Sequence, residues 1–207
     1  MKANEIMKIS PIVPVIALDK VEDALPLADA LLAGGVAIME ITLRTSAALE
    51  CIEIIAKEFP QMNVGAGTVT NASNFQDAIN AGAQFAFSPG ISQEIMDFSS
   101  TSNITLIPGV CTASEVMFAQ NNDFLHCKLF PATVAGGTEA LKAFAGPFAQ
   151  MRFCPTGGVS LENIKSFLLL PNVLCAGGSW IVPKRAMEEK NYQLITKLCK
   201  EVFEVIS

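Results

Sequence analysis

The sequence predicts an α/β protein in which residues 1–207 form one domain, a (β/α)8 or TIM barrel. Short apolar runs recur every 20 to 25 residues, and segments with helical periodicity separate them. The runs are continuously apolar rather than alternating, which is typical of strands buried on both faces of a parallel sheet. The length is at the lower limit for a barrel of this class and is too short for two domains of ordinary size.

Eight apolar runs are the candidate strands, and helical segments alternate with them along the whole chain. The runs cover residues 12–18, 36–42, 62–65, 85–88, 104–107, 125–130, 151–154 and 173–176. The first full helix ends before Gly34-Gly35, because apolar residues recur at helical spacing up to Leu32. We expect a last helix over about 185–205 to close the ring, and residues 1–9 to form a short helix across one end of the barrel.

Charge and composition exclude several classes of partner. The net charge of −6 and the absence of a basic run argue against nucleic acid. No apolar stretch approaches the roughly 20 residues of a membrane span, and residues 1–10 lack the apolar core of a signal peptide, so the cytoplasm is the expected location. The high hydrophobic content of 51% favours extensive two-faced burial or a subunit interface.

Cysteine and histidine usage bears on metals and redox state. The cysteines are scattered singly, without metal-ligand spacing, and are expected to be buried thiols in a reducing compartment: Cys51, Cys111, Cys127, Cys154, Cys175 and Cys199. The single histidine, His126, nearly excludes a histidine-rich zinc or iron site and is expected to be a core residue. A carboxylate-only metal site stays open without support, so we expect neither a metal ion nor a cofactor.

Two ionisable residues interrupt predicted strands, where a lone charge is costly to bury. Glu40 falls in the run 36–42 and Lys128 in the run 125–130, each in the later half of its strand, where active sites of this fold lie. An ordinary lysine with a pKa of about 10.4 is almost fully protonated at pH 7, so a nucleophilic lysine has to be desolvated. We expect Lys128 to be such a nucleophile. The alternatives are that Lys128 reaches solvent from the strand end or pairs with a carboxylate, and that Glu40 forms a structural ion pair with a neighbouring lysine or arginine.

Two neighbouring strand exits carry groups suited to an anion. Arg44 lies on a predicted loop, where a guanidinium can bind a carboxylate through two hydrogen bonds, although an exposed arginine near a helix start is also common. The sequence Gly65-Ala66-Gly67-Thr68 lacks the third glycine and the later acidic residue of a dinucleotide fingerprint. We expect a tight turn that presents the Thr68 hydroxyl and backbone amides to an anion.

Paired glycines follow the last two predicted strands, in Pro155-Thr156-Gly157-Gly158 and Gly177-Gly178-Ser179-Trp180. Exposed amides and a helix start at these positions would bind phosphate without a lysine, and phosphate sites of this fold often lie here. Ser160 is expected to cap the helix after the first pair. Plain turns are the alternative.

The order and spacing of these motifs resemble the family of 2-keto-3-deoxy-6-phosphogluconate (KDPG) and 4-hydroxy-2-oxoglutarate (KHG) aldolases. The resemblance covers about residues 11–200 and includes Glu40, Arg44, Gly65-Ala66-Gly67-Thr68, Ser88-Pro89-Gly90, Ile107-Pro108-Gly109, Lys128-Leu129-Phe130-Pro131-Ala132 and both glycine-pair segments. It implies a homotrimeric class I aldolase that releases pyruvate without a metal ion.

The resemblance also implies a role for each matching residue. Lys128 is the Schiff-base lysine and Glu40 the proton-transferring base, while Arg44 and Thr68 hold the pyruvate carboxylate. The implied phosphate-binding residues are Gly157, Gly158, Gly178 and Ser179, and Pro89 and Thr156 are further pocket residues.

One departure from the family leaves the substrate open. Many members read Lys-Phe-Phe-Pro-Ala-Glu where this chain has Leu129 and Thr133 at the second and sixth positions. Leu129 is expected to face outward, whereas Thr133 removes an acidic group near the site and leaves substrate breadth undecided. The same chemistry on KHG or on 2-keto-3-deoxy-6-phosphogalactonate stays open, although the glycine pairs favour a phosphorylated substrate. A barrel isomerase or synthase that binds sugar phosphate without a covalent lysine and a non-catalytic sugar-phosphate sensor are the more distant alternatives.

Overall fold

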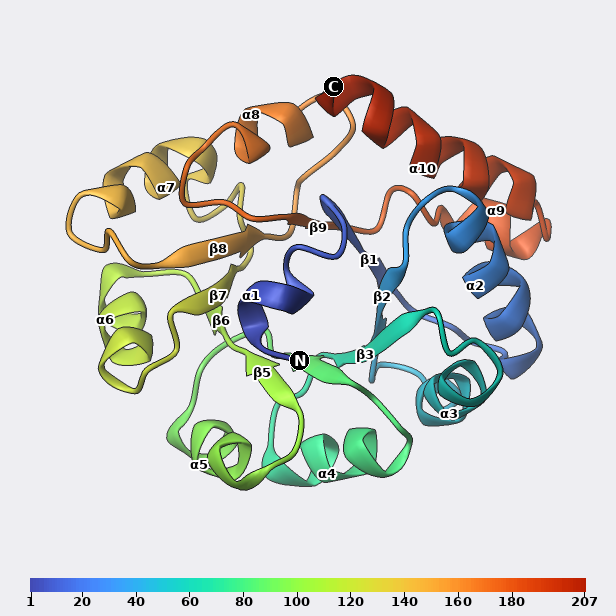
Figure 1. The fold of residues 1–207 in the computed structure, drawn as a ribbon, viewed down its shortest axis with the longest axis horizontal. Helices are drawn as coiled ribbons and strands as arrows, with labels where there is room; N and C mark the ends of the chain where they lie inside the picture. Colours follow the sequence, from blue (N-terminus) through green and yellow to red (C-terminus); the bar gives the residue numbers. More distant parts are fainter.

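Parallel strands alternate with helices throughout the computed structural model, which describes residues 1–207. The strands lie around a common centre, and the helices cover their outer side (Figure 1). Every strand pairing between named strands is parallel. The architecture is therefore an α/β fold with a curled parallel sheet, of the TIM-barrel-like class, which confirms the α/β part of the prediction.

The elements have the following bounds. The strands are β1 (Ile12–Ile16), β2 (Ile38–Thr42), β3 (Asn63–Gly67), β4 (Phe85–Phe87), β5 (Thr105–Ile107), β6 (Gly109–Val110), β7 (His126–Leu129), β8 (Arg152–Pro155) and β9 (Ala176–Gly178). The helices are α1 (Ala3–Ile6), α2 (Ala24–Ala33), α3 (Ala48–Glu58), α4 (Ala72–Asn80), α5 (Gln93–Thr101), α6 (Ala113–Asn121), α7 (Gly137–Ala145), α8 (Ile164–Leu168), α9 (Lys184–Glu188) and α10 (Tyr192–Ile206), with a 3-10 helix η1 (Val21–Asp23) before α2.

The strands form two hydrogen-bonded sheets. Six strands pair in the order β5-β4-β3-β2-β1-β9, and three pair in the order β6-β7-β8. Only Pro108 separates β5 from β6, and its carbonyl accepts a hydrogen bond of 2.9 Å from the Lys128 amide. Isolated parallel bridges pair Phe153 with Val173 and Thr156 with Gly177. The two sheets therefore approach each other along both of their edges.

The predicted strand over residues 173–176 was placed too early in the sequence. The structure has β9 at Ala176–Gly178, where its ladder with β1 starts at the pair Ile12 and Ala176. The apolar pattern missed this segment because two of its three residues are glycines. A Cβ at Gly177 would collide with the Thr156 hydroxyl, so the close approach of these strands requires glycine there.

Two predictions about helices were wrong. The last helix is interrupted between α9 and α10, where Lys190 has a φ of 52° and the Asn191 side chain accepts a hydrogen bond of 3.1 Å from the Leu194 amide. A residue in the left-handed region cannot continue a right-handed helix, and the asparagine caps the next one. Ser160 is not the N-cap of α8, because its hydroxyl donates to the Glu162 carboxylate and the helix begins only at Ile164.

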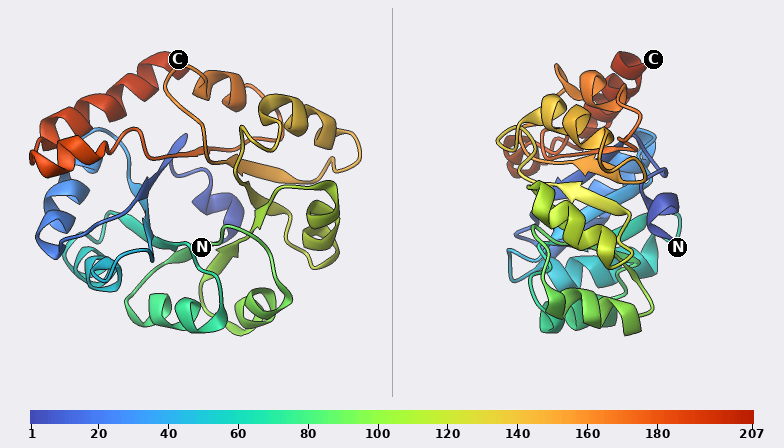
Figure 2. Two further views of the ribbon diagram at one scale, coloured as in Figure 1. Left: turned by 180° about the vertical axis from the view of Figure 1, so that it is seen from behind. Right: turned by 90° about the vertical axis from the view of Figure 1, so that its left-hand side faces the viewer.

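The predicted short helix at the N-terminus is confirmed as α1, which lies across one end of the ring of strands (Figures 1 and 2). Thr105, the first residue of β5, donates a hydrogen bond of 2.6 Å to the Met1 carbonyl. Ile6 and Met7 are fully buried in the hydrophobic core, and burial of such side chains contributes about 1.5–3 kcal/mol each. The N-terminal segment thus covers the amino ends of the strands.

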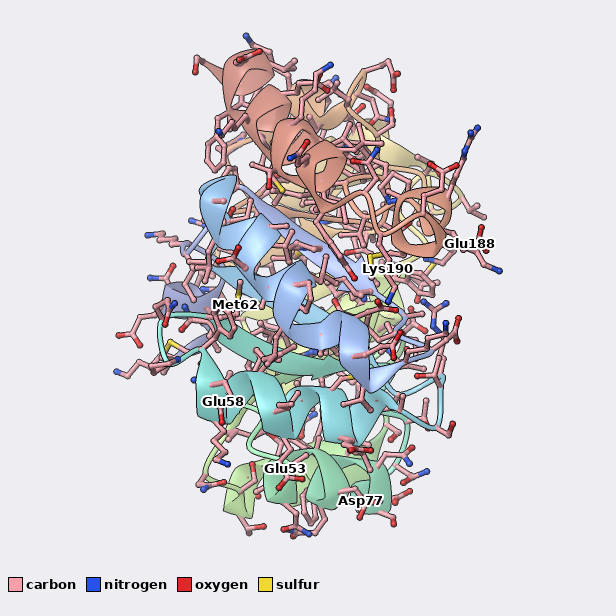
Figure 3. All side chains as sticks on the ribbon, turned by 90° about the vertical axis from the view of Figure 1, so that its right-hand side faces the viewer. Glu53, Glu58, Met62, Asp77, Glu188 and Lys190 are labelled. Carbon is pink, nitrogen blue, oxygen red and sulfur yellow. The ribbon has the colours of Figure 1, made fainter.

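The opposite end of the molecule holds the carboxyl ends of the strands. Glu58, the last residue of α3, and Met62 lie toward one end, and Glu188 and Lys190 lie toward the other (Figure 3). Active sites of TIM-barrel enzymes lie at the carboxyl ends of the strands, so the active site is expected at the end that carries Glu188. None of the helices combines the length and the apolar character needed to cross a membrane.

Candidate active site

Lys128 on β7 and Glu40 on β2 form a buried ion pair. The Lys128 Nζ lies 3.0 Å from Glu40 Oε1 and 3.3 Å from Oε2. The two side chains are only 6% and 2% exposed. Both charges are almost entirely removed from bulk water, so each depends on the other, and removal of one partner from such a pair typically costs about 3–5 kcal/mol. The structure therefore brings together the two ionisable residues that interrupt the predicted strands.

Two aromatic rings flank the Lys128 amine. Its Nζ lies 5.4 Å from the centre of the Phe87 ring and 5.5 Å from that of Phe130, within the range of a cation–π contact. Neither ring was predicted from the sequence to be part of the site, because phenylalanine at a strand end is usually a core residue. The rings make an apolar wall around an amine that is paired with a carboxylate.

The absence of a side chain at Gly67 provides the space that the Glu40 carboxylate occupies. A Cβ at Gly67 would collide with Glu40 Oε1 and lie 2.6 Å from its Cγ. Gly67 pairs with Thr42 in the β2–β3 ladder, so it belongs to the strand next to that of Glu40. The glycine is thus required for packing against Glu40, a contact that the sequence alone does not reveal. After Gly67, where a tight turn was expected, Thr68 has a φ of 61° in the left-handed region, but residues 68–70 form no regular turn.

Arg44 and Thr68 follow the carboxyl ends of the adjacent strands β2 and β3. The Leu43 amide donates a hydrogen bond of 2.9 Å to the Gly67 carbonyl, and each predicted carboxylate-binding residue follows one of these two. Arg44 is exposed, and its Nε donates to Thr42 Oγ1 at 3.0 Å. Its hydrogen bond runs to Thr42 rather than to the Lys128–Glu40 pair.

The two glycine-pair segments lie side by side. Thr156, just before the first pair, forms a parallel bridge with Gly177 in the second. Gly157 and Gly158 have φ values of 97° and 77°, a conformation that glycine adopts without strain. The Gly157 carbonyl accepts hydrogen bonds from the Thr133 amide at 3.1 Å and from its hydroxyl at 3.3 Å. Thr133, the departure from the family pattern, is therefore in direct contact with this loop.

Pro89 belongs to a loop that packs on the strand beside Lys128. Gly109 pairs with Lys128 in the β6–β7 ladder, and a Cβ at Gly109 would collide with the Pro89 carbonyl. The buried Ser88 hydroxyl accepts from the Gly109 amide at 3.3 Å and donates to the Gly90 carbonyl at 2.6 Å. These contacts place the Pro89 loop directly against the strand that neighbours the lysine.

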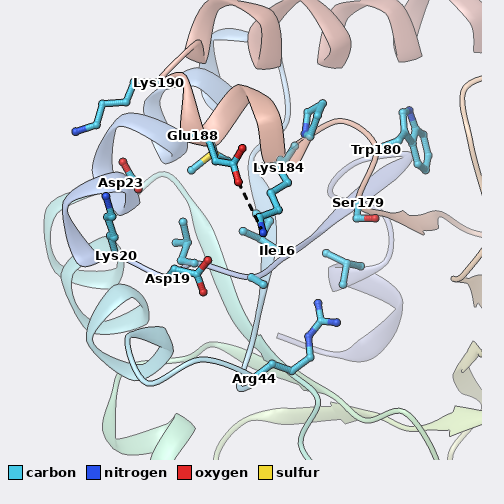
Figure 4. A pocket seen from close by; sticks show the side chains of 16 residues that line it. Ile16, Asp19, Lys20, Asp23, Arg44, Ser179, Trp180, Lys184, Glu188 and Lys190 are labelled. Carbon is cyan, nitrogen blue, oxygen red and sulfur yellow. Dashed lines mark ion pairs between the residues drawn. The ribbon is translucent and has the colours of Figure 1, made fainter.

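A cavity of about 690 Å³ opens at this end of the molecule. Arg44 and Ser179 line it together with Trp180, and the ion pair of Lys184 and Glu188, 3.7 Å long, lies within it (Figure 4). The volume is within the range of small-molecule pockets. Neither Lys128 nor Glu40 lines this cavity.

His126 is the first residue of β7 and lies at the other end of the strand from the site. It is half-buried rather than a core residue, and it lines a second cavity of about 330 Å³ together with Ser102 and Asp123. Burial lowers the pKa of His126, and the positive charges of Arg152 and Lys8 lower it further.

The cysteines are free thiols, and five of the six are buried, as expected, while Cys111 is half-buried. Burial raises the pKa of Cys51 to about 11 and the pKa of Cys127 and Cys199 to about 12. Thiols with such pKa values are protonated near neutral pH and are poor nucleophiles.

Comparison with known proteins identifies the chain. The model of the KDPG and KHG aldolase family matches residues 3–198. The 2-dehydro-3-deoxy-phosphogluconate aldolase of Dickeya dadantii is 49% identical over 96% of this chain and 93% of its own length. The KHG/KDPG aldolase of Escherichia coli K12 is 48% identical over 98% of this chain and 95% of its own length.

A solved structure agrees with these matches. The KDPG aldolase of Legionella pneumophila, with pyruvate captured at low pH as a covalent carbinolamine intermediate, superposes with a TM-score of 0.95 at 47% identity, and the match covers 97% of each chain. The chain is thus an aldolase, an enzyme of the lyase class. Within that class it belongs to the KDPG and KHG aldolase family, which confirms the resemblance seen in the sequence.

Proposed function

We propose that this protein is a class I aldolase that cleaves KDPG to pyruvate and glyceraldehyde 3-phosphate through a Schiff base on Lys128. The observation that carries the proposal is the buried pair, with Lys128 Nζ 3.0 Å from Glu40 Oε1. A buried amine beside two aromatic rings, with a carboxylate at hydrogen-bond distance that can carry protons, is suited to imine formation with a ketone. The covalent pyruvate in the Legionella relative supports the same chemistry here.

The proposed reaction uses one nucleophile and one proton carrier. Lys128 first gives up a proton to water, the neutral amine attacks the C2 ketone, and the resulting hydroxyl takes a proton back and leaves as water to give an iminium. Glu40 then takes the proton of the C4 hydroxyl, the C3–C4 bond breaks, and its electron pair moves through C3 to the iminium nitrogen to give an enamine and a free aldehyde. Glu40 returns the proton to C3, and water hydrolyses the new iminium to release pyruvate. The iminium itself accepts the electrons, so the scheme needs neither a metal ion nor a cofactor.

The remaining predicted residues are proposed to hold the substrate. Arg44 and Thr68 leave adjacent strands beside Glu40, where they would bind the pyruvate carboxylate and bring the ketone within reach of Lys128. Backbone amides and a hydroxyl would bind the phosphate, from Gly157, Gly158, Gly178 and Ser179, with Thr156 and Pro89 as walls of the pocket.

KHG is a second candidate substrate by the same mechanism. The Escherichia coli relative is named for both KHG and KDPG, and the chemistry at C2 to C4 is the same for both. KHG has no phosphate, so the neighbouring glycine pairs favour KDPG, or its epimer 2-keto-3-deoxy-6-phosphogalactonate, over KHG. A non-covalent isomerase or synthase would instead use Lys128 only for its charge.

The finer architecture and the assembly are also proposals. A closed eight-stranded barrel in a single domain would count β5 and β6 as one strand broken at Pro108, and the bridges from Phe153 and Thr156 toward β9 support closure. A homotrimer in the cytoplasm is proposed from the family alone.

The test is to incubate the protein with pyruvate and sodium cyanoborohydride and to measure the intact mass and a peptide map. A reduced pyruvate adduct on Lys128 is expected. Absence of an adduct on folded protein would favour the non-covalent alternative and remove the role proposed for Lys128. A coupled assay of pyruvate release from KDPG and from KHG then ranks the two substrates.

A further inference from the structure

Thr42, the last residue of β2, connects Arg44 to the neighbouring strand through its hydroxyl. Thr42 is buried, with 1% of its surface exposed. Its Oγ1 donates a hydrogen bond of 2.8 Å to the Ile16 carbonyl and accepts one of 3.0 Å from Arg44 Nε. A hydroxyl has a single proton, so the bond to Ile16 leaves only lone pairs for Arg44, and a guanidinium can only donate. Each of the two hydrogen bonds therefore has a single possible direction: Arg44 donates to Thr42, and Thr42 donates to Ile16.

The Ile16 carbonyl, which accepts the hydrogen bond of Thr42, belongs to the paired part of the sheet. Ile16 is the last residue of β1 and pairs with Ile41 in the parallel ladder between β1 and β2. The hydroxyl of Thr45 donates a hydrogen bond of 2.5 Å to the Leu18 carbonyl, so the loops that follow both strands are joined as well. Arg44 is thus attached to the fixed end of the sheet, although its side chain is exposed.

The bond to Nε determines which part of the guanidinium is free. An arginine side chain has five N–H donors in one plane, and Thr42 occupies the one on Nε. The two terminal nitrogens remain available for a carboxylate, which they can bind through two parallel hydrogen bonds. The Arg44 side chain points into the cavity that Ser179 also lines (Figure 4). A free arginine would have to lose its rotamer freedom on binding, whereas a held one has already lost it.

We propose that Thr42 is a positioning residue that holds the Arg44 guanidinium ready for the carboxylate of the 2-oxo acid. The proposal rests on the proposed function, because it takes Arg44 as the carboxylate-binding group. A purely structural Thr42 would satisfy the Ile16 carbonyl and affect folding, but it would weaken the binding of charged and neutral ketones equally. A positioning Thr42 affects only ketones that carry a carboxylate, and it acts only while Arg44 is present.

The experiment compares the wild type with Thr42→Val, Thr42→Ser, Arg44→Met and the double variant Thr42→Val/Arg44→Met. Each protein is titrated with pyruvate, and separately with its neutral amide, pyruvamide, in the presence of cyanoborohydride, and the half-saturating concentration for adduct formation on Lys128 is measured. Thr42→Val is expected to raise the value for pyruvate about 5- to 10-fold and to leave that for pyruvamide unchanged. Thr42→Ser retains the hydroxyl and is expected to match the wild type. In the Arg44→Met background, Thr42→Val is expected to change the value less than about 2-fold.

Two results would overturn the proposal while leaving the aldolase function intact. One is a half-saturating pyruvate concentration of Thr42→Val that equals the wild-type value. The other is an effect of Thr42→Val that is equally large in the Arg44→Met background or with pyruvamide. Thermal unfolding of each variant identifies a folding defect, and Thr42→Ala replaces Thr42→Val if valine prevents folding. Other results would contradict the proposed function itself. These are the absence of an adduct on the wild type, or an Arg44→Met variant with the wild-type half-saturating concentration for pyruvate. Either result would also remove the role proposed for Thr42.

Discussion

Lys128 Nζ lies 3.0 Å from Glu40 Oε1, although the two residues are 88 positions apart in the sequence. Lys128 belongs to the three-stranded sheet and Glu40 to the six-stranded sheet, so the pair joins the two sheets across the interior. Both side chains are buried, and each compensates the charge of the other. The same contact therefore bears on stability and on the proposed chemistry.

Lys128→Met is expected to abolish KDPG cleavage and the trapping of pyruvate, because Lys128 supplies the amine that is paired with Glu40. The variant leaves Glu40 buried without its partner, so a loss of unfolding free energy on the order of 3 kcal/mol is also expected, measured by urea titration. Lys142→Met is the matched control, since Lys142 pairs with Glu139 on the surface and is 56% exposed. Cleavage by folded Lys128→Met would contradict the covalent mechanism.

Glu40→Gln is expected to lower kcat by a factor of about 10²–10⁴ while pyruvate is still trapped on Lys128, because the amide cannot accept the proton of the C4 hydroxyl. The measurement is the rate of pyruvate release beside the yield of the reduced adduct. Glu53→Gln on the exposed side of α3 serves as the control. If trapping and turnover fell together, Glu40 would instead act in imine formation.

Gly67→Ala is expected to reduce kcat about 10- to 100-fold, because the new Cβ would collide with Glu40 Oε1 and displace the carboxylate. Gly90→Ala tests the same change on a neighbouring loop, where a Cβ would meet no atom within 4 Å. Steady-state kinetics of both variants with KDPG decides the point. Equal kinetics for the two variants would show that Glu40 tolerates the methyl group.

Ser179→Asp is expected to raise the KM for KDPG by about 10-fold or more and to change the KM for KHG little, because a carboxylate repels the phosphate that only KDPG carries. Ser179→Asn, which adds similar bulk without charge, is the control. The ratio of the two KM values for each variant is the quantity to measure. An unchanged ratio would remove the phosphate-binding role of Ser179.

His126 is expected to make the protein less stable in mildly acidic solution. In the folded protein its pKa is lowered from the ordinary value of 6.5, chiefly by burial. The unfolded chain therefore binds more protons than the folded protein as the pH falls below 6.5. Stability that is present above pH 6.5 is therefore lost as the pH falls through the folded pKa. Urea unfolding between about pH 7.5 and 5.5 should show a flatter pH dependence for His126→Gln than for the wild type. Parallel curves would show that other groups cause the loss.

Much of the fold was predictable because it depends on local properties of the chain. Apolar runs buried on two faces, helical periodicity and the positions of Glu40 and Lys128 within their strands are all visible in the sequence. Two of the predictions that failed did so for different reasons, one local and one that depends on a distant part of the chain. The break in the last helix depends on the backbone angle of Lys190, and β9 is a strand because its glycines allow close approach to Thr156.

The sequence by itself determined the α/β class, the order of the elements and which residues were unusual for their place. Only the tertiary structure decided that the partner of Lys128 is Glu40, that Phe87 and Phe130 flank the amine, and that the Thr42 hydroxyl holds Arg44. Periodicity and polarity are set by neighbours along the chain. Distances between strands are set by the curl and register of the sheet, which come from the packing of the whole core.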